Sequence, residues 1–470
     1  MSEKFRLIGY AKLEEELGMR GLDCEIRNAV TVSSQLDRVI FPPGKAAVNA
    51  LRVKKNSANF NAAGECSMLW HALYALKHEG VNLFVLSTYI KNMPEKDICE
   101  LEARLELNKN GAAERKFACL FEKLQKRPLR LNAGTTDVRR SYIDLFSKDQ
   151  YCVLRNIPET RFDKKYRVVD NSLGEIGQFS PTVRKTECIL NEISKWNSGG
   201  YSEQKINGFT MGIKQHINDL IKLESKRAFE IEGDANNSKG RKFFAELLRD
   251  LSRGLAAFNE EEFTTIHNKI VSDALIEPGF RNFQNFVSEG NEMVSIPVYL
   301  CPPANDIKNF FEGLSNLYTV ACTNSEEITP VIAGTLVASG FIHLHPFSDG
   351  NGRIARYLLH DIFTKRGLRP EGLAIPVSTI IRENSLEYTG VLKKVWSGVM
   401  DNIKYHFSID GREVIIDKCP EDVYRYPDFT EMTEMMVGFV DKAIKELPFL
   451  LNGCNRENMN SADGDISFDR

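Results

Sequence analysis

The chain has 470 residues, of which 42% are hydrophobic, so it can bury a sizeable core. Its 61 basic and 64 acidic side chains leave a formal net charge of -3. No overall positive field would attract nucleic acid or an anionic membrane, and we expect neither as a partner. Any binding of anions therefore has to come from a local site.

The ten cysteines are scattered and form no C-x-x-C pair or zinc-type spacing, which is typical of buried thiols in a reducing compartment. The first residues, MSEKFRLIGY, lack the apolar run of a signal peptide, and no run of eighteen uncharged apolar residues follows. These features predict a cytoplasmic location. Export by a system that reads other signals stays open, as for a secreted effector.

The N-terminal part is predicted to be mostly helical. Residues 1–60 show no clean period, whereas 67–125 carry apolar residues at steps of three and four, as a helical module does. Residues 150–186 are less regular. We therefore predict an N-terminal accessory region over 1–180.

A second helical series follows and predicts a mainly α fold. A helix with one broad apolar face ends at Gly233, because glycine accepts the left-handed conformation. Two extended arms around Ser-Glu-Gly-Asn-Glu at 283–300 predict a hairpin. The stretch 329–345 is apolar nearly all round and predicts a central buried helix. Residues 401–470 predict a packed helix followed by a flexible tail.

The stretch HLHPFSDGNGRIAR at 343–356 lies between two of these helices and holds several residues that can bind anions or take part in catalysis. Backbone N–H groups of Gly350, Asn351 and Gly352 would be the unpaired donors of a helix N-terminus, which suits phosphate oxygens. The two glycines let the backbone approach a ligand closely. This pattern predicts an anion cradle.

The charged residues of the stretch extend the cradle. Arg353 and Arg356 are one helical turn apart and can add donors to a polyphosphate. Asp349 is an oxygen ligand suited to Mg²⁺, and His345 is a candidate general base near neutral pH. Each feature alone has an ordinary explanation as a turn, a cap or a solvated face. Their joint occurrence points to phosphoryl or nucleotidyl transfer.

The segment HPFSDGNGRIAR resembles the signature H-P-F-x-D/E-G-N-G-R-x-x-R of the Fic family at every defined position. The resemblance implies a helical Fic core over 181–400 and transfer of AMP from ATP to a hydroxyl side chain of a target protein. It further implies that His345 deprotonates the target hydroxyl, Asp349 holds Mg²⁺ and Phe347 anchors the loop in the core. The phosphates would then be held by Gly350, Asn351, Gly352, Arg353 and Arg356.

Two further stretches resemble parts of this family. The hairpin at about 283–300 is similar to the Fic flap, along which a target protein binds as an extended segment. By this match the residues against the nucleotide would be Asn285, Phe286, Val287 and Ser288. The stretch IIRENSLEYTGVL, which follows the signature, resembles the helix whose tyrosine lines the adenine pocket and points to Tyr388.

The segment ESKRAFEIEGD resembles the inhibitory helix of the family, with the pattern Ser/Thr-x-x-x-Glu-Gly/Asn, and we place this helix at about 213–233. Glu232 would then pair with Arg356 and occupy the position of the γ-phosphate. Ala228 stands where a Ser or Thr is expected. A lost hydroxyl hydrogen bond is worth about 0.5–1.5 kcal/mol, so we expect a less firmly held inhibitory helix.

Several alternatives stay open at this stage. The same site could remove AMP or transfer another nucleotide, since the glycine-asparagine triplet does not specify the base. The chain could also be a regulatory or interaction protein that uses the Fic core as a nucleotide sensor. The sequence identifies neither the target protein nor the oligomeric state, and a homodimer is left open.

Overall fold

The computed structural model describes residues 5–7, 9–19, 31–33, 38–40, 67–108, 110–132, 141–201, 217–251, 254–291, 294–323, 325–368, 373–408 and 413–457. The chain forms two compact units. The first comprises Met1–Ser172, Trp396–His406 and Ile415–Tyr426, and the second comprises Leu173–Val395, Phe407–Val414 and Pro427–Arg470. Most described residues are helical, which confirms the mainly α prediction. No helix in these ranges has the length and apolar character needed to cross a membrane.

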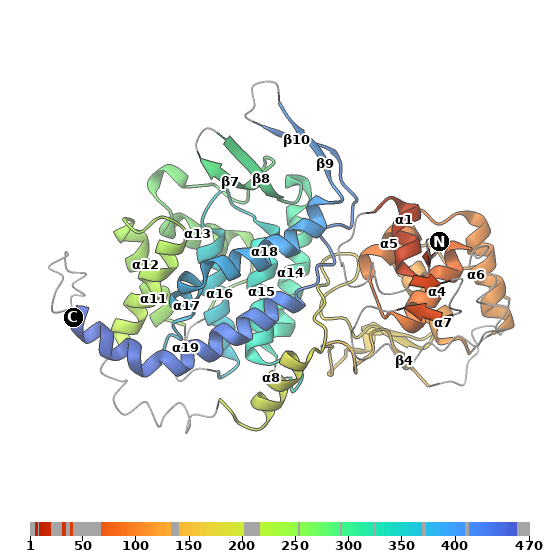
Figure 1. Cartoon of the computed structure of the whole chain (residues 1–470), viewed down its shortest axis with the longest axis horizontal. Helices are drawn as coiled ribbons and strands as arrows, with labels where there is room; N and C mark the ends of the chain where they lie inside the picture. The colour runs from red at the N-terminus through yellow and green to blue at the C-terminus, as the bar shows by residue number, and fades with distance from the viewer. Residues whose placement is uncertain are drawn as a thin grey trace. The chain divides into compact units, whose positions relative to one another are not determined.

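The first unit contains the helices labelled α1 and α4–α7 in Figure 1, together with two small sheets. Its helices are α1 (Tyr10–Leu17), α4 (Met68–His78), α5 (Leu83–Lys91), α6 (Glu95–Leu107) and α7 (Ala112–Gln125). An antiparallel meander contains β1 (Phe5–Leu7), β2 (Thr31–Ser33) and β3 (Arg38–Ile40). The second sheet has the order β4 (Ile143–Asp144), β6 (Val168–Val169), β5 (Phe162–Asp163), and the short helix η1 (Glu159–Arg161) precedes β5.

The second unit contains the longer helical series. It begins with α8 (Glu187–Asn197), α11 (Ile217–Ile231), α12 (Ser238–Arg249), α13 (Glu260–Ile270) and η2 (Asp273–Leu275). The antiparallel strands β7 (Phe286–Asn291) and β8 (Val294–Leu300) form the predicted hairpin. The series continues with η3 (Ala304–Asp306), α14 (Ile307–Cys322), α15 (Pro330–Leu344), α16 (Asn351–Lys365), α17 (Val377–Glu383) and α19 (Thr430–Glu457).

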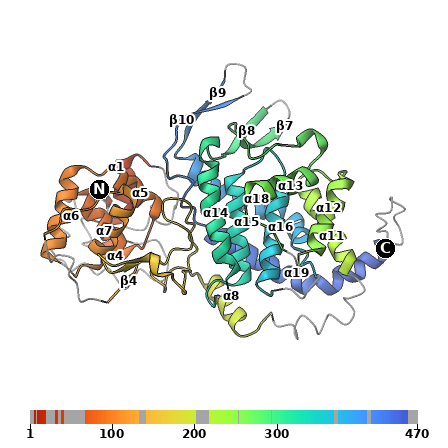
Figure 2. The ribbon, with the colours of Figure 1, turned by 180° about the vertical axis from the view of Figure 1, so that it is seen from behind.

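Helix α15 is the centre of the second unit. Thr329 caps its first turn by accepting a hydrogen bond from the Ile332 N–H, and Pro330 fills its first helical position. Every residue of α15 except Ile342 is buried. It packs against α14, α16 and α19, and both views show α14, α15 and α16 side by side (Figures 1 and 2). The loop after α15 is therefore held on a rigid support.

The unit boundary and the C-terminal segment differ from the sequence-based outline. Thr182 pairs in parallel with Asp428, and its N–H donates to the carbonyl of Pro427. Residues 173–186 thus belong to the second compact unit, and the accessory region over 1–180 stays a prediction.

The hairpin of β9 (Lys404–Phe407) and β10 (Val414–Lys418) within 401–470 was not predicted, since its short strands carry no strict alternation. It follows α18 (Ser385–Met400) in the chain, and the residues of these three elements are divided between the two units. The tail beyond 457 and residues 213–216 of the predicted inhibitory helix lie outside the described residues.

Candidate active site

His345 ends the central helix in an unusual backbone conformation. It has φ 49 and ψ 59, the left-handed region that a residue with a Cβ enters at a cost of about 1–2 kcal/mol. Its Nδ1 lies 3.2 Å from the carbonyl oxygen of Ile342. Because a carbonyl only accepts, Nδ1 carries the proton in the neutral ring and Nε2 keeps its lone pair. The ring is thus arranged as a base.

Burial lowers the pKa of His345 to about 4, although the side chain is only half-buried by its exposed area. The charge of Arg281 lowers this pKa further, whereas Glu232 and Asp349 raise it. Desolvation is the largest of these causes. His345 is therefore neutral at physiological pH.

The loop that follows His345 is fixed by Phe347 and Asn351. The Phe347 side chain is fully buried and stacks on His267 with ring centroids 4.1 Å apart. The Asn351 side chain accepts a hydrogen bond from the Phe347 N–H at 3.1 Å and donates to the Phe347 carbonyl at 2.8 Å. The side chain of Asn351 therefore holds the loop. Its backbone N–H is the group that it contributes to the first turn of α16.

The start of α16 has the glycine-rich form of the predicted anion cradle, but the Gly350 N–H, predicted to be unpaired, donates to Oδ1 of Asp349 at 2.5 Å. Gly350 precedes the helix at φ 79, a conformation that favours glycine, and provides no side-chain cap for the first turn. A Cβ placed on Gly352 would lie 2.3 Å from Oε1 of Glu232. The carboxylate of Glu232 thus lies directly against the cradle, where an anion suits the helix dipole.

The same carboxylate forms an ion pair with the second arginine of the motif. Glu232 lies in the turn just after α11, and its Oε1 accepts a hydrogen bond of 2.6 Å from Nη2 of Arg356. Nη2 also donates to the carbonyl of Ala228 at 2.8 Å. Arg356 is buried, so the contact is little screened by solvent. Ala228 therefore contributes through its backbone, for which no hydroxyl is needed.

The first arginine of the motif is also bound to carboxylates. Arg353 is fully buried, its Nη1 forms an ion pair with Asp234, and its Nη2 lies 3.1 Å from Oδ2 of Asp349. Its guanidinium stands over the ring of Phe229. Asp234 was not predicted from the sequence, since it follows the inhibitory pattern and no spacing rule links it to Arg353.

Tyr388 lies beside this arrangement on α18. Its side chain is buried, and burial raises the pKa of its hydroxyl to about 12. Arg356 and Glu232 both act electrostatically on that pKa, which places all three side chains near one another. A role at the adenine ring stays a prediction.

The flap residues lie at one edge of the motif loop. The side-chain amide of Asn285 is 3.4 Å from the carbonyls of both Phe347 and Ser348. Phe286, Val287 and Ser288 belong to β7, and a register irregularity falls between Val287 and Ser288. This geometry brings the hairpin to the loop, but contact with a nucleotide remains a prediction.

Three residues that hold the site were given no role in the sequence analysis. Arg281 donates to the carbonyl of His345, and His267 places Nε2 at 3.1 Å from the carbonyl of Asp349. The carboxylate of Glu277 accepts from the N–H of Ser348 at 2.8 Å. These residues act on backbone atoms, which leave no side-chain pattern in a sequence. In the structure, Arg281 and His267 are recognisable as buried polar side chains.

Asp349 is the predicted Mg²⁺ ligand. Its carboxylate is 43% exposed at the mouth of the cradle, and the described residues contain no cluster of three His, Cys, Asp or Glu side chains. Mg²⁺ usually binds through one or two carboxylates together with phosphate oxygens and water. In this structure Oδ1 accepts from the Gly350 N–H at 2.5 Å and Oδ2 pairs with Nη2 of Arg353 at 3.1 Å, so a metal arriving with a nucleotide would have to displace these contacts.

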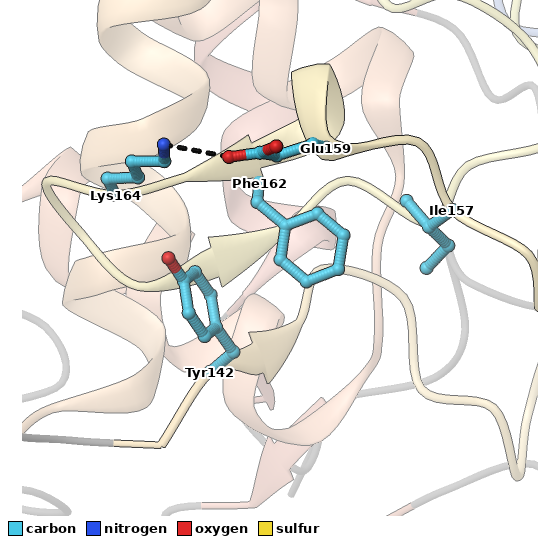
Figure 3. A pocket seen from close by; sticks show the side chains of 5 residues that line it. All are labelled: Tyr142, Ile157, Glu159, Phe162 and Lys164. Carbon is cyan, nitrogen blue, oxygen red and sulfur yellow. Dashed lines mark hydrogen bonds and ion pairs between the residues drawn. The ribbon is translucent and has the colours of Figure 1, made fainter.

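A separate pocket lies in the first unit (Figure 3). It is lined by Tyr142, Ile157, Glu159, Phe162 and Lys164. Lys164 and Glu159 form a 2.9 Å ion pair, and both side chains are well exposed. Such a pair is worth little and is screened by salt, so we assign no chemistry to this pocket.

The structure thus places the loop that carries His345 next to the glycine-rich start of α16 on a helical core. Residues 257–363 match the model of the Fic/DOC family. The protein adenylyltransferase and cysteine protease IbpA of Histophilus somni (strain 2336) is 24% identical over 211 residues, which are 44% of this chain and 4% of that relative. Residues 257–363 thus resemble a Fic/DOC domain, and the chain spans only 4% of the length of the curated relative that it matches.

A solved structure was also found to be similar. It is that of a Fic family protein from Desulfovibrio desulfuricans G20, with a TM-score of 0.39 and 17% sequence identity. The match covers 57% of this chain and 75% of the other.

Proposed function

We propose that this protein is an adenylyltransferase that transfers AMP from Mg-ATP to a Ser, Thr or Tyr hydroxyl of a target protein. The observation that carries the proposal is the placement of a neutral histidine, His345, one short loop before the cradle at Gly350–Gly352. A base and a phosphate site at this spacing suit attack of a hydroxyl on a phosphorus atom. The relation to IbpA, itself named a protein adenylyltransferase, supports the same chemistry.

The reaction uses the chain's own groups as follows. Nε2 of His345 takes the proton of the target hydroxyl, and the hydroxyl oxygen forms a bond to the α-phosphorus of ATP. The bond between that phosphorus and the oxygen leading to the β-phosphate breaks, and pyrophosphate leaves. Backbone N–H groups at the start of α16, with Arg353 and Arg356, stabilise the charge on the phosphate oxygens. Mg²⁺, held by Asp349, supplies further charge neutralisation when bound.

The contacts of Glu232 support an inhibited ground state. Its carboxylate lies against Gly352 and is paired with Arg356, so the γ-phosphate of ATP would meet a negative charge at its binding position. Asp234 pairs in the same way with Arg353. We propose that the turn after α11 must release both arginines before ATP is held in a productive pose. The target would bind as an extended segment along β7, in the manner of an added strand.

The test uses ATP labelled at the α-phosphate and, in parallel, at the γ-phosphate. The Glu232→Gly chain should become labelled, or label proteins of a lysate, from the α-position only, and His345→Ala in the same background should abolish the label. Label from the γ-position would indicate phosphate transfer. Loss of AMP from a previously modified protein would favour the reverse activity. Absence of any label in the active variant would refute the proposal.

A further inference from the structure

Arg281 connects the catalytic loop to both ends of the flap. Its Nε donates to the carbonyl of His345 at 2.8 Å, and its backbone N–H donates to the carbonyl of Pro346 at 2.9 Å. Nη1 donates to the carbonyl of Phe283 at 2.8 Å, and Nη2 donates to that of Pro302 at 2.6 Å. The side chain is only 3% exposed. One rigid group thus joins the residues before β7, the residues after β8 and the histidine.

The shape of the guanidinium suits this role. Its donors have a fixed planar geometry, so three carbonyls bound to it keep fixed positions relative to one another. The carbonyl of His345 needs such support, because the residue is held in the left-handed region at φ 49. Relaxation of His345 to an ordinary conformation would change the position of its ring relative to the start of α16.

The charge of Arg281 also favours the neutral form of His345, which is the form that can act as a base. Of the charged groups that act on the ring of His345, Arg281 favours the neutral imidazole, whereas Glu232 and Asp349 favour the protonated one. Removal of Arg281 would therefore raise the pKa of His345. A structural arginine remote from His345 would leave that pKa unchanged.

We infer that Arg281 is a positioning residue of the transfer reaction, which fixes the backbone of His345 relative to the two ends of the flap. This inference rests on the proposed function. The flap holds the target segment, so Arg281 sets the distance between the target hydroxyl and the base. Displacement by about 1 Å can reduce a rate by about 100-fold.

The experiment compares Arg281→Met with Arg281→Lys, both in the full chain carrying Glu232→Gly. Arg281→Met should lower kcat for AMP transfer by about 100-fold. The KM for Mg-ATP should change little, because the phosphate donors lie at the start of α16. Arg281→Lys keeps the charge and some of the donors, so it should recover part of kcat.

Arg366 provides a matched control within the same unit. It is also a buried arginine, and it donates to the carbonyls of Ala321, Ser325 and Ile328. Arg366→Met should lower thermal stability to a similar degree but leave the pH dependence of kcat/KM in place. If Arg366→Met and Arg281→Met affect kcat and its pH dependence equally, Arg281 has only a structural role.

A second readout does not depend on transfer. The ring of His345, assigned by comparison with His345→Ala, can be titrated by NMR in the parent and in Arg281→Met. The inference predicts a higher pKa in Arg281→Met and a parent-like pKa in Arg281→Lys. If the Glu232→Gly chain is inactive but its histidine pKa rises in Arg281→Met, only the proposed function is refuted. An active parent whose kcat and histidine pKa are unaffected by Arg281→Met would refute the inference alone.

Discussion

Arg356 binds Glu232 through a 2.6 Å ion pair that joins positions 124 residues apart in the chain. The pair brings the turn after α11 onto the first turns of α16, and the same carboxylate lies against Gly352. The arginine that would bind a phosphate thus already holds an anion. We predict that release of Arg356 from Glu232 is the event that allows activity.

Removing the carboxylate of Glu232 should increase AMP transfer. A hydrogen bond between charged groups is worth about 1.5–3 kcal/mol, so we expect a gain of about 10- to 100-fold for Glu232→Gly. Glu232→Gln should give a smaller gain. The measurement is the initial rate of labelling from α-labelled ATP. The matched control is Glu230→Gln, because Glu230 pairs with Arg382 instead of a motif arginine; an equal gain there would contradict a specific role of Glu232.

Asp234→Asn should also raise the rate, but by less. Its side chain is 30% exposed, and partly exposed pairs are worth about 0.2–1 kcal/mol, so a gain of about two- to five-fold is expected. Asp273→Asn serves as the control, since Asp273 forms an exposed pair with Lys239. A reduced rate with weakened ATP binding would mean that Asp234 orients Arg353 for the nucleotide and does not inhibit.

The pH dependence of kcat/KM in Glu232→Gly should lack a decline near pH 6.5. The pKa of His345 is lowered to about 4 by burial, so the neutral base persists as pH falls until that pKa is approached. Loss of the Glu232 charge lowers the pKa further, in the same direction. Stopped assays between pH 4 and pH 8 would measure kcat/KM of Glu232→Gly over this range. An acidic limb with a midpoint near the ordinary value of histidine would show that the ring is solvated in the working enzyme.

Phe347→Ala should destabilise the second unit strongly. The ring is fully buried and packs on His267 and Phe280, and such truncations cost about 3–5 kcal/mol. Urea unfolding followed by a probe in this unit should show the loss. Phe283→Ala, at an exposed phenylalanine, should have little effect on the same transition. Equal effects of the two substitutions would argue against Phe347 as the anchor of the loop.

The sequence indicated the central helices and the motif because their signals are local. The apolar stretch around Val337 predicted a buried helix, and Gly350 marked the turn that starts α16. The hairpin of β7 and β8 was likewise visible as two extended arms around a glycine turn. These features depend on neighbours within a few residues.

The remaining contacts depend on packing between distant segments. Arg281 binds carbonyls, so any residue type could have stood at its partner positions. The pairing of Asp234 with Arg353 spans 119 residues and follows from where α11 ends. The backbone contact of Ala228 with Arg356 shows why the missing hydroxyl did not prevent a close approach of α11 to α16. Contacts of this kind can be recognised only once the fold is known.

The most direct test of the central claim is intact-protein mass spectrometry of three chains incubated with Mg-ATP and a cell lysate. These are the wild type, Glu232→Gly and Glu232→Gly combined with His345→Ala. Our account predicts that Glu232→Gly increases the yield of AMP-modified protein, on itself or in the lysate, and that the added His345→Ala removes it. Equal modification in the wild type and Glu232→Gly, or modification that persists without His345, would contradict the account.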